Sequence, residues 1–145
     1  MSLNNRKVYT GGTFDLFHTG HVNLLRQCKE IGDYVVVSLN TDEFIYRYKG
    51  EYPIISYEER KDVLLSCKYV DEVVVYATET ELLDILRSYP IDVRIVGDEY
   101  ADKEFTGKDL SMKIYYNRRE HSFSTTELRG RVIKRHQEQE DDLPF

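Results

Sequence analysis

The sequence lacks long apolar runs and has few cysteines. Within 145 residues no hydrophobic stretch approaches the roughly 20 residues that cross a bilayer. The N-terminus also lacks the apolar core of a secretion signal, so we expect a cytoplasmic protein with no membrane partner. Its two cysteines, Cys28 and Cys67, fall within predicted helices at spacings unrelated to the histidines. We therefore expect reduced thiols rather than a disulfide or a zinc site.

An excess of positive charge is also missing. The net charge is −6, and four of the acidic residues lie in the last eight positions. Non-specific nucleic-acid binding needs a basic surface, so we expect no nucleic-acid partner. A small anionic ligand needs only a local cluster of donors and stays possible. The composition suits one folded domain, which we place at residues 1–136, followed by an acidic and flexible tail at 137–145.

Glycines are sparse where a dinucleotide-binding protein needs them. Proteins that bind NAD or FAD carry the pattern G-x-G-x-x-G directly after the first strand. Here Gly11 and Gly12 are followed by no further glycine before Gly20. The sequence therefore disfavours NAD or FAD as a ligand.

The chain does contain a regular alternation of β-branched runs and amphipathic stretches. After a first strand at Val8, we expect further strands at residues 33–39, 71–76, 92–96 and 113–116. Between and after them we expect helices at residues 21–30, 57–67, 80–89 and from 124 to about 136. This order predicts an α/β protein with a Rossmann-like open parallel sheet of about five strands and helices on both faces. Ligands of such sheets bind at the carboxyl ends of the strands.

The first predicted strand runs into residue types that favour phosphate. After Gly11 and Gly12 come Thr13, Asp15 and then His18 and His21 at the start of a helix. Free backbone N–H groups and the dipole at a helix N-terminus attract an anion, and histidines three apart share one helix face. Gly12 lets a phosphate approach the backbone closely. The segment predicts a phosphate site, the alternative being that one histidine caps the helix and the other packs.

A second group of phosphate-binding residue types lies near the C-terminus. Arg118, Arg119 and His121 precede Ser124, Thr125 and Thr126 at a predicted helix start. Hydroxyls and free N–H groups there can hold phosphate oxygens, and an arginine can bind one with two parallel hydrogen bonds. The alternative is a capped helix beside solvated arginines.

Both segments resemble motifs of one enzyme family. The stretch GTFDLFHTGH at residues 12–21 resembles the HxGH signature of the nucleotidyltransferase superfamily, in the form used by cytidylyltransferases. The stretch REHSFSTT at residues 119–126 resembles the RTEGISTT motif of cytidylyltransferases, which contacts the triphosphate, with Ser122 and Phe123 replacing glycine and isoleucine. The resemblance covers about residues 8–128 and is nearest to the glycerol-3-phosphate cytidylyltransferases. It implies the HUP/nucleotidyltransferase fold type, a cytidylyltransferase-like domain at 1–136 and a homodimer.

The resemblance also implies roles for individual residues. Catalytic roles fall to His18, His21 and Arg119. Nucleotide-binding roles fall to the residues at motif positions, namely Gly12, Thr13, Phe14, Lys68, Asp98, Glu99, Ser124, Thr125 and Thr126. Lys68 stands in place of the arginine of the RYVDE motif, and Asp98 and Glu99 fall in a GDDW-like segment near the cytosine. Taken alone, Lys68 reads as a solvated lysine and Asp98 as a turn residue.

Three residues are implied to bind the acceptor, namely Asp15, Lys49 and Arg60. Asp15 has two further interpretations, because it could hold a metal through water or cap the turn. Arg60 could instead form a helix-surface ion pair with Glu59.

The implied reaction transfers CMP from CTP to a small alcohol phosphate, with sn-glycerol 3-phosphate as the first candidate, giving a CDP-alcohol and pyrophosphate. Mg²⁺ is expected on the triphosphate. No side chain is placed as a covalent nucleophile, so catalysis would rest on in-line placement and charge stabilisation. The alternatives are an adenylyltransferase that uses ATP and a sugar or cofactor phosphate, a non-catalytic nucleotide-binding module, and a structural subunit with a vestigial site.

Overall fold

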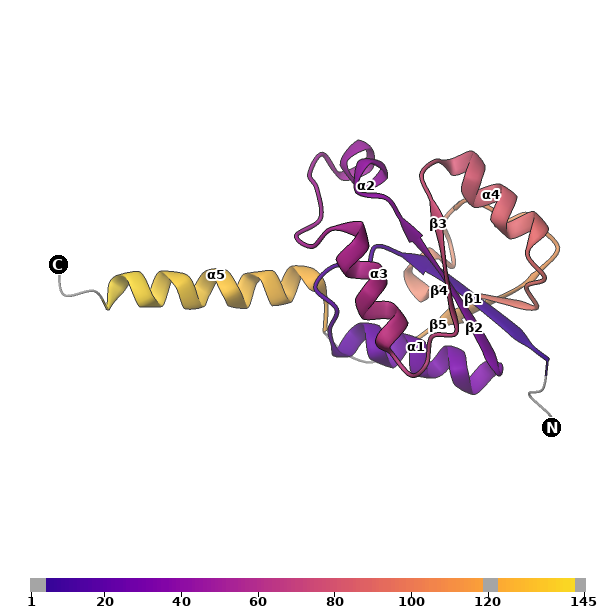
Figure 1. Ribbon diagram of the computed structural model, residues 1–145, viewed down its shortest axis with the longest axis horizontal. Helices are drawn as coiled ribbons and strands as arrows, with labels where there is room; N and C mark the ends of the chain where they lie inside the picture. Colours follow the sequence, from indigo (N-terminus) through magenta and orange to yellow (C-terminus); the bar gives the residue numbers. More distant parts are fainter. Residues whose placement is uncertain (1–4, 119–122, 143–145) are drawn as a thin grey trace.

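A single parallel sheet organises the molecule. The computed structural model describes residues 5–118 and 123–142. Within these residues five strands pair in the order β3-β2-β1-β4-β5, all parallel (Figure 1). The strands are β1 (Lys7–Gly12), β2 (Tyr34–Asn40), β3 (Glu72–Tyr76), β4 (Val93–Gly97) and β5 (Lys113–Asn117). The predicted Rossmann-like sheet of five strands is confirmed.

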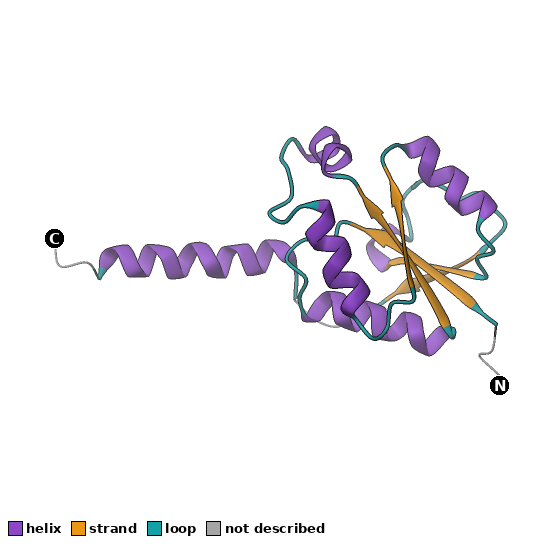
Figure 2. Ribbon diagram, in the orientation of Figure 1, coloured by secondary structure: helices purple, strands orange, loops and turns teal. Residues whose placement is uncertain are grey.

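Helices lie between the strands and on both faces of the sheet, and a last helix follows the final strand. They are α1 (Thr19–Ile31), α2 (Asp42–Lys49), α3 (Tyr57–Ser66), α4 (Glu79–Ser88) and α5 (Thr125–Asp141), with a short 3₁₀ helix η1 (Asp98–Tyr100) after β4. Figure 2 shows α1 and α3 on one side of the strands and α4 on the other. No helix in the described ranges is both long enough and apolar enough to cross a membrane.

The alternation of side chains along the central strands builds a separate core under each helical layer. Val8 of β1 belongs to the core beneath α1 and α3, with Leu25 of α1 and Leu64 of α3. The next residue, Tyr9, points to the other face and packs in the core beneath α4 with Leu82. Successive strand residues face opposite sides, so a nearly continuous apolar run serves both cores.

The strand order places a crevice beside β1. From β1 the chain passes to β2 on one side and later to β4 on the other, so the connections after β1 and β4 diverge. At such a point an open parallel sheet leaves a crevice at the carboxyl ends of its strands. The histidine segment between β1 and α1 therefore lies where this fold binds ligands.

The last helix extends beyond its predicted end. Helix α5 reaches Asp141 and projects away from the sheet (Figure 1). The predicted boundary at residue 136 therefore does not coincide with the end of the helix, because the acidic stretch is tied to the preceding turn. His136 Nε2 lies 3.1 Å from Glu140 Oε1, a pairing four residues apart on one helix face.

Candidate active site

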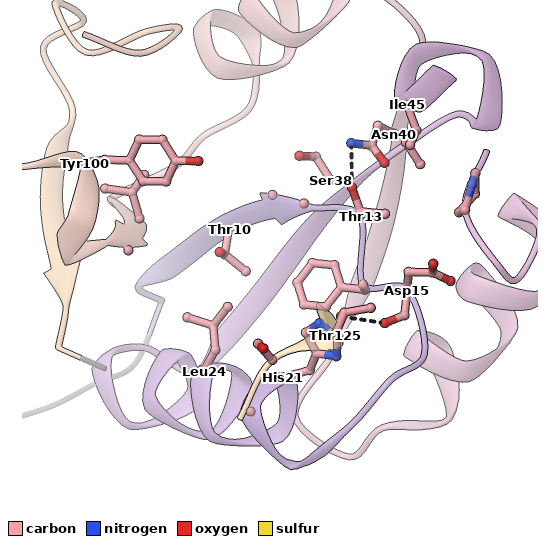
Figure 3. Close-up of a pocket in the computed structure, with 18 of the residues that line it drawn as sticks. Thr10, Thr13, Asp15, His21, Leu24, Ser38, Asn40, Ile45, Tyr100 and Thr125 are labelled. Carbon is pink, nitrogen blue, oxygen red and sulfur yellow. Dashed lines mark hydrogen bonds between the residues drawn. The ribbon is translucent and has the colours of Figure 1, made fainter. Parts of the chain in front are cut away.

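A pocket of about 640 Å³ opens at the carboxyl ends of the central strands. Its walls come from the end of β1 and the turn that follows, the first turns of α1 and α5, the loop after α2, and the segment from η1 to Thr106. Figure 3 shows side chains from these distant segments facing one space. Segments predicted separately as phosphate-binding thus line one pocket.

The two histidines cap helix α1 together. His18 is the N-cap residue, and its Nδ1 accepts a hydrogen bond from the Gly20 N–H at 3.0 Å. Nδ1 of His21 accepts from the His18 N–H at 3.1 Å, and the two rings stack with centroids 3.8 Å apart. In a neutral imidazole, an accepting Nδ1 places the proton on Nε2. Both rings therefore carry their N–H donors on Nε2.

The start of α5 meets this histidine pair. His18 Nε2 lies 3.2 Å from Thr125 Oγ1, and the Thr125 hydroxyl donates to the Asp15 carbonyl at 3.0 Å, the bond dashed in Figure 3. Ser124 caps α5 by accepting from the Glu127 N–H at 3.0 Å. Two helix N-termini thus open onto one pocket, a concentration of N–H donors and dipole charge that suits a polyphosphate.

The turn between β1 and α1 is tightly constrained. Phe14 and Leu16 adopt left-handed φ values of 52° and 51°, which side-chain-bearing residues rarely adopt. Between them Asp15 is 7% exposed, and its two carboxylate oxygens accept from the Ile54 and Ile55 N–H groups at 2.8 and 3.0 Å. Residues in such conformations cluster at functional sites, where surrounding contacts hold them.

These contacts decide the role of Asp15. Its carboxylate accepts from the N–H groups of a distant loop, Ile54 and Ile55, rather than from its own turn as one of the sequence interpretations expected. Each oxygen accepts one of these N–H groups, so the carboxylate of Asp15, which also lines the pocket, positions the loop that carries Tyr52 and Pro53 into the pocket wall. The described residues also contain no cluster of three potential metal ligands.

The predicted acceptor contact from Arg60 is wrong. Its side chain is 1% exposed and stands behind the pocket wall, with all five N–H donors used. Nη1 donates to the Thr13 carbonyl and Asn40 Oδ1, and Nη2 to the Asn40 carbonyl and, at 2.6 Å, to Asp42 Oδ1. Nε donates to the Ile55 carbonyl at 3.2 Å. Arg60 instead ties together the turn after β1, the end of β2 and the start of α3.

Two predicted nucleotide contacts also lie outside the pocket. Lys68 precedes β3 at the amino edge of the sheet, opposite the pocket, and its ammonium lies 5.2 Å from the centre of the Tyr69 ring. Asp98 is exposed and does not line the pocket, whereas its neighbour Glu99 does. Of the two predicted segments, the one at residues 98–99 therefore reaches the pocket through Glu99, whereas the segment of Lys68 does not.

The remaining predicted residues lie at the pocket, with one exception. Arg119 falls outside the described residues. The pocket wall includes all the others, namely Gly12, Thr13, Phe14, His18, His21, Lys49, Glu99, Ser124, Thr125 and Thr126.

Sequence reasoning missed the wall on the α4 face. Tyr9, Ser38, Tyr76 and Arg94 line this part of the pocket. Tyr76 ends β3 and Ser38 lies near the end of β2, whereas Tyr9 and Arg94 pair with each other in the first halves of β1 and β4. The Tyr9 hydroxyl is hydrogen-bonded to the Ser38 hydroxyl, and burial raises the pKa of Tyr9 above its usual range. A Cβ at Gly11 would lie 2.4 Å from Ser38 Oγ, so only glycine fits there. The one feature of the sequence that could have indicated these pocket residues is the presence of polar side chains within apolar strand segments.

Fold and site together define a nucleotidyltransferase, and comparison with known proteins specifies the family. Residues 9–131 match the cytidylyltransferase-like family, and the chain belongs to it. The fold is shared with the lipopolysaccharide core biosynthesis protein from Thermoplasma volcanium GSS1, with a TM-score of 0.64 at 23% identity over 81% of this chain and 98% of that one.

The chain is also similar to individual enzymes of this family. The chain is 39% identical over 128 residues to the glycerol-3-phosphate cytidylyltransferase of Bacillus subtilis (strain 168), covering 88% of this chain and 97% of that enzyme. It is 40% identical over 97 residues to the ethanolamine-phosphate cytidylyltransferase of Dictyostelium discoideum, covering 66% of this chain and 27% of that enzyme. The two relatives are named for different acceptors.

Proposed function

We propose that the protein transfers CMP from CTP to sn-glycerol 3-phosphate, giving CDP-glycerol and pyrophosphate. The observation that carries the proposal is the hydrogen bond between His18 and Thr125, which joins the two phosphate-binding helix starts at one pocket. Similarity along nearly the whole length of a glycerol-3-phosphate cytidylyltransferase supports the choice of substrates.

The reaction needs no covalent intermediate and no strong base. A phosphate oxygen of the acceptor attacks the α-phosphorus of CTP, and a new P–O–P bond forms. The bond from the α-phosphorus to the oxygen it shares with the β-phosphorus breaks, and the electron pair leaves with pyrophosphate. The acceptor oxygen is already anionic, so no proton has to be removed. The protein contributes alignment and stabilisation of the charge that develops on the phosphoryl oxygens.

The chain's own groups fit these tasks. The Nε2–H group of His21 would donate to oxygens around the α-phosphorus. That of His18, which donates to Thr125 Oγ1 in this structure, would be shared with or passed to a phosphoryl oxygen when the nucleotide binds. The start of α5, with the hydroxyls of Ser124 and Thr126, would hold the leaving pyrophosphate, and Lys49, which also lines the pocket, would contact the acceptor phosphate. With Asp15 engaged, the described residues do not fit a resident metal site, so we propose that Mg²⁺ enters with the triphosphate as part of the substrate.

Pyrophosphate release over a matrix of nucleotides and acceptors tests the proposal. CTP and ATP would each be combined with glycerol 3-phosphate, phosphoethanolamine and a sugar 1-phosphate. We expect turnover with CTP and glycerol 3-phosphate and identification of CDP-glycerol by mass spectrometry. Preferential use of ATP would establish an adenylyltransferase instead, and tight CTP binding without any product would establish a nucleotide-binding module.

The homodimer is a prediction carried by the family resemblance, and the cytoplasmic location is one made from the sequence composition. We propose a cytoplasmic homodimer. Light scattering of the purified protein tests the homodimer, since a monomer at micromolar concentration would contradict it.

A further inference from the structure

Arg94 is a buried cation without an anionic partner among the residues that the structure describes. It lies on β4, is 8% exposed and lines the pocket. Its Nη1 donates to the Thr106 carbonyl, which is its only hydrogen bond within the described part of the chain. No carboxylate of those residues forms an ion pair with it. Buried charges are normally paired, because removing a charge from water is costly.

The surroundings hold the guanidinium in place without neutralising it. Its central carbon lies 5.2 Å from the centre of the Phe105 ring and 6.0 Å from that of Tyr9. Glu79 attracts the Arg94 charge electrostatically at longer range, but the Glu79 carboxylate accepts hydrogen bonds from the hydroxyls of Thr106 and Tyr48. Burial lowers the pKa of Arg94, although the side chain stays charged near neutrality.

The segment that covers Arg94 is built around it. Gly107 adopts a φ of +82°, and a Cβ there would lie 2.9 Å from Arg94 Nη1. A side chain at residue 107 would therefore collide with the guanidinium as well as strain the backbone. The positive charge of Arg94 is thus a fixed part of the pocket wall, whereas the charge of Lys49 is carried by an exposed side chain.

Arg94 lies away from the groups that hold phosphate. His21 packs on Phe14 and Phe17, beside the core under α1 and α3, whereas Arg94 stacks near Tyr9 in the core under α4. The two regions meet at the rim of β1, where Gly11 presents no side chain. A small alcohol phosphate that places its phosphate near the histidines can therefore direct its other end towards Arg94.

We infer that Arg94 is the specificity-determining residue for the acceptor's carbon chain, binding hydroxyl or carboxylate oxygens and rejecting an ammonium group. The inference rests on the proposed function and concerns the part of the substrate that does not react. Guanidinium donors pair with oxygen acceptors, most strongly with carboxylates. An ammonium at the same place would meet an unscreened like charge in a region of low dielectric. The pocket would thus favour glycerol 3-phosphate over phosphoethanolamine.

Equilibrium binding to the unaltered protein gives the first test. Calorimetry with glycerol 3-phosphate, 3-phosphoglycerate and phosphoethanolamine compares three ligands that share a phosphate and differ at the other end. We expect 3-phosphoglycerate to bind at least as tightly as glycerol 3-phosphate, and phosphoethanolamine about 10-fold more weakly or worse. Equal affinities, or tightest binding of phosphoethanolamine, would overturn the inference.

Substitution of Arg94 gives the second test. In Arg94→Met the preference for glycerol 3-phosphate over phosphoethanolamine should fall about 10-fold or more, in both affinity and kcat/KM. Arg94→Lys should still reject phosphoethanolamine but bind glycerol 3-phosphate less well, since the planar donor pair is lost. Arg87→Met, an exposed arginine of α4 outside the pocket, is the matched control and should leave the preference unchanged.

The ratio of the kcat/KM values for two substrates does not depend on the fraction of the protein that is folded. Partial destabilisation of a variant therefore does not change this ratio. If Arg94→Met and Arg94→Lys both leave the ratio unchanged while lowering the melting temperature, Arg94 is structural and the inference fails. Absence of CMP transfer by the unaltered protein would refute the proposed function alone, because the binding series does not depend on turnover.

Discussion

His18 and His21 use their two ring nitrogens for different purposes. Each Nδ1 accepts a backbone N–H at the start of α1, and Nε2 of His18 reaches Thr125 on a helix more than a hundred residues away. Asparagine or serine would cap a helix equally well. Capping therefore does not explain the choice of histidine, whereas an Nε2–H donor facing the pocket does.

The substitution His18→Asn separates these two purposes. Asparagine is a good N-cap residue, so the melting temperature should change little. CMP transfer should fall about 10²–10³-fold, because a donor to the reacting phosphoryl group is lost. Steady-state pyrophosphate release and thermal unfolding measure the two effects. Near-normal turnover with an intact cap would remove His18 from the mechanism.

Thr125 positions the histidine and should behave differently. Thr125→Val keeps the shape but removes the hydroxyl that links His18 Nε2 to the Asp15 carbonyl. We expect kcat to fall about 10-fold, in line with the loss of a well-placed hydrogen bond of 1–1.5 kcal/mol. Thr125→Ser should restore most of the activity. Equal loss in the valine and serine variants would show that the methyl group matters rather than the hydroxyl.

At the scale of secondary-structure elements, Arg60 joins segments that are distant in sequence. Its guanidinium bonds to the turn after β1, to Asn40 at the end of β2 and to Asp42 in the first turn of α2. All of these acceptors lie at the carboxyl rim of the sheet. The arginine therefore stabilises the rim on which the pocket is built.

Arg60→Met should consequently destabilise the whole domain. The methionine fills similar space but leaves buried carbonyl oxygens without a donor, and each such group costs about 1–3 kcal/mol. We expect the urea midpoint to fall clearly, whereas Arg87→Met on the surface should leave it unchanged. A midpoint equal to that of the unaltered protein would show that water satisfies these carbonyls.

The sequence predicted elements better than it predicted the directions of side chains. Hydrophobic periodicity located α3 and α4, and the capping pattern of Ser56 with Glu59 marked the start of α3. Thr78, which caps α4, was not predicted. The role of Arg60 depends on Asn40 and Asp42, partners supplied by another part of the chain, and no local pattern reports such a contact. Asp98 and Glu99 are adjacent in sequence, and only the course of η1 decides which of them faces the pocket.

At the scale of the whole molecule, the sheet topology accounts for the site. Alternating strands and helices predicted a parallel sheet but not the order of its strands. The observed order places β1 beside β4 at the crevice. The α4-face wall was not foreseen, since Tyr9 and Arg94 read as ordinary members of strand runs. Their part in the pocket follows from the pairing of β1 with β4.

The buried cysteine Cys28, in the core under α1 and α3, predicts how the stability of the protein depends on pH. Burial raises the pKa of the Cys28 thiol from 9.0 to about 12. The folded state thus favours the protonated thiol, so this contribution is complete below pH 9 and is lost as the pH rises towards 12. The free energy of unfolding in urea should fall over that window. Cys28→Ala should show a shallower fall, and identical slopes in both proteins would contradict the assignment.

The central claim is that the histidine pair and the start of α5 bind one nucleoside triphosphate. The dissociation constant of CTP, measured by calorimetry for the unaltered protein and for His21→Asn and Thr126→Val, tests it most directly. We predict that both substitutions weaken CTP binding about 10-fold, as expected for the loss of one hydrogen bond to a charged group. If either substitution leaves the dissociation constant unchanged, the two helix starts do not share a ligand and the account is contradicted.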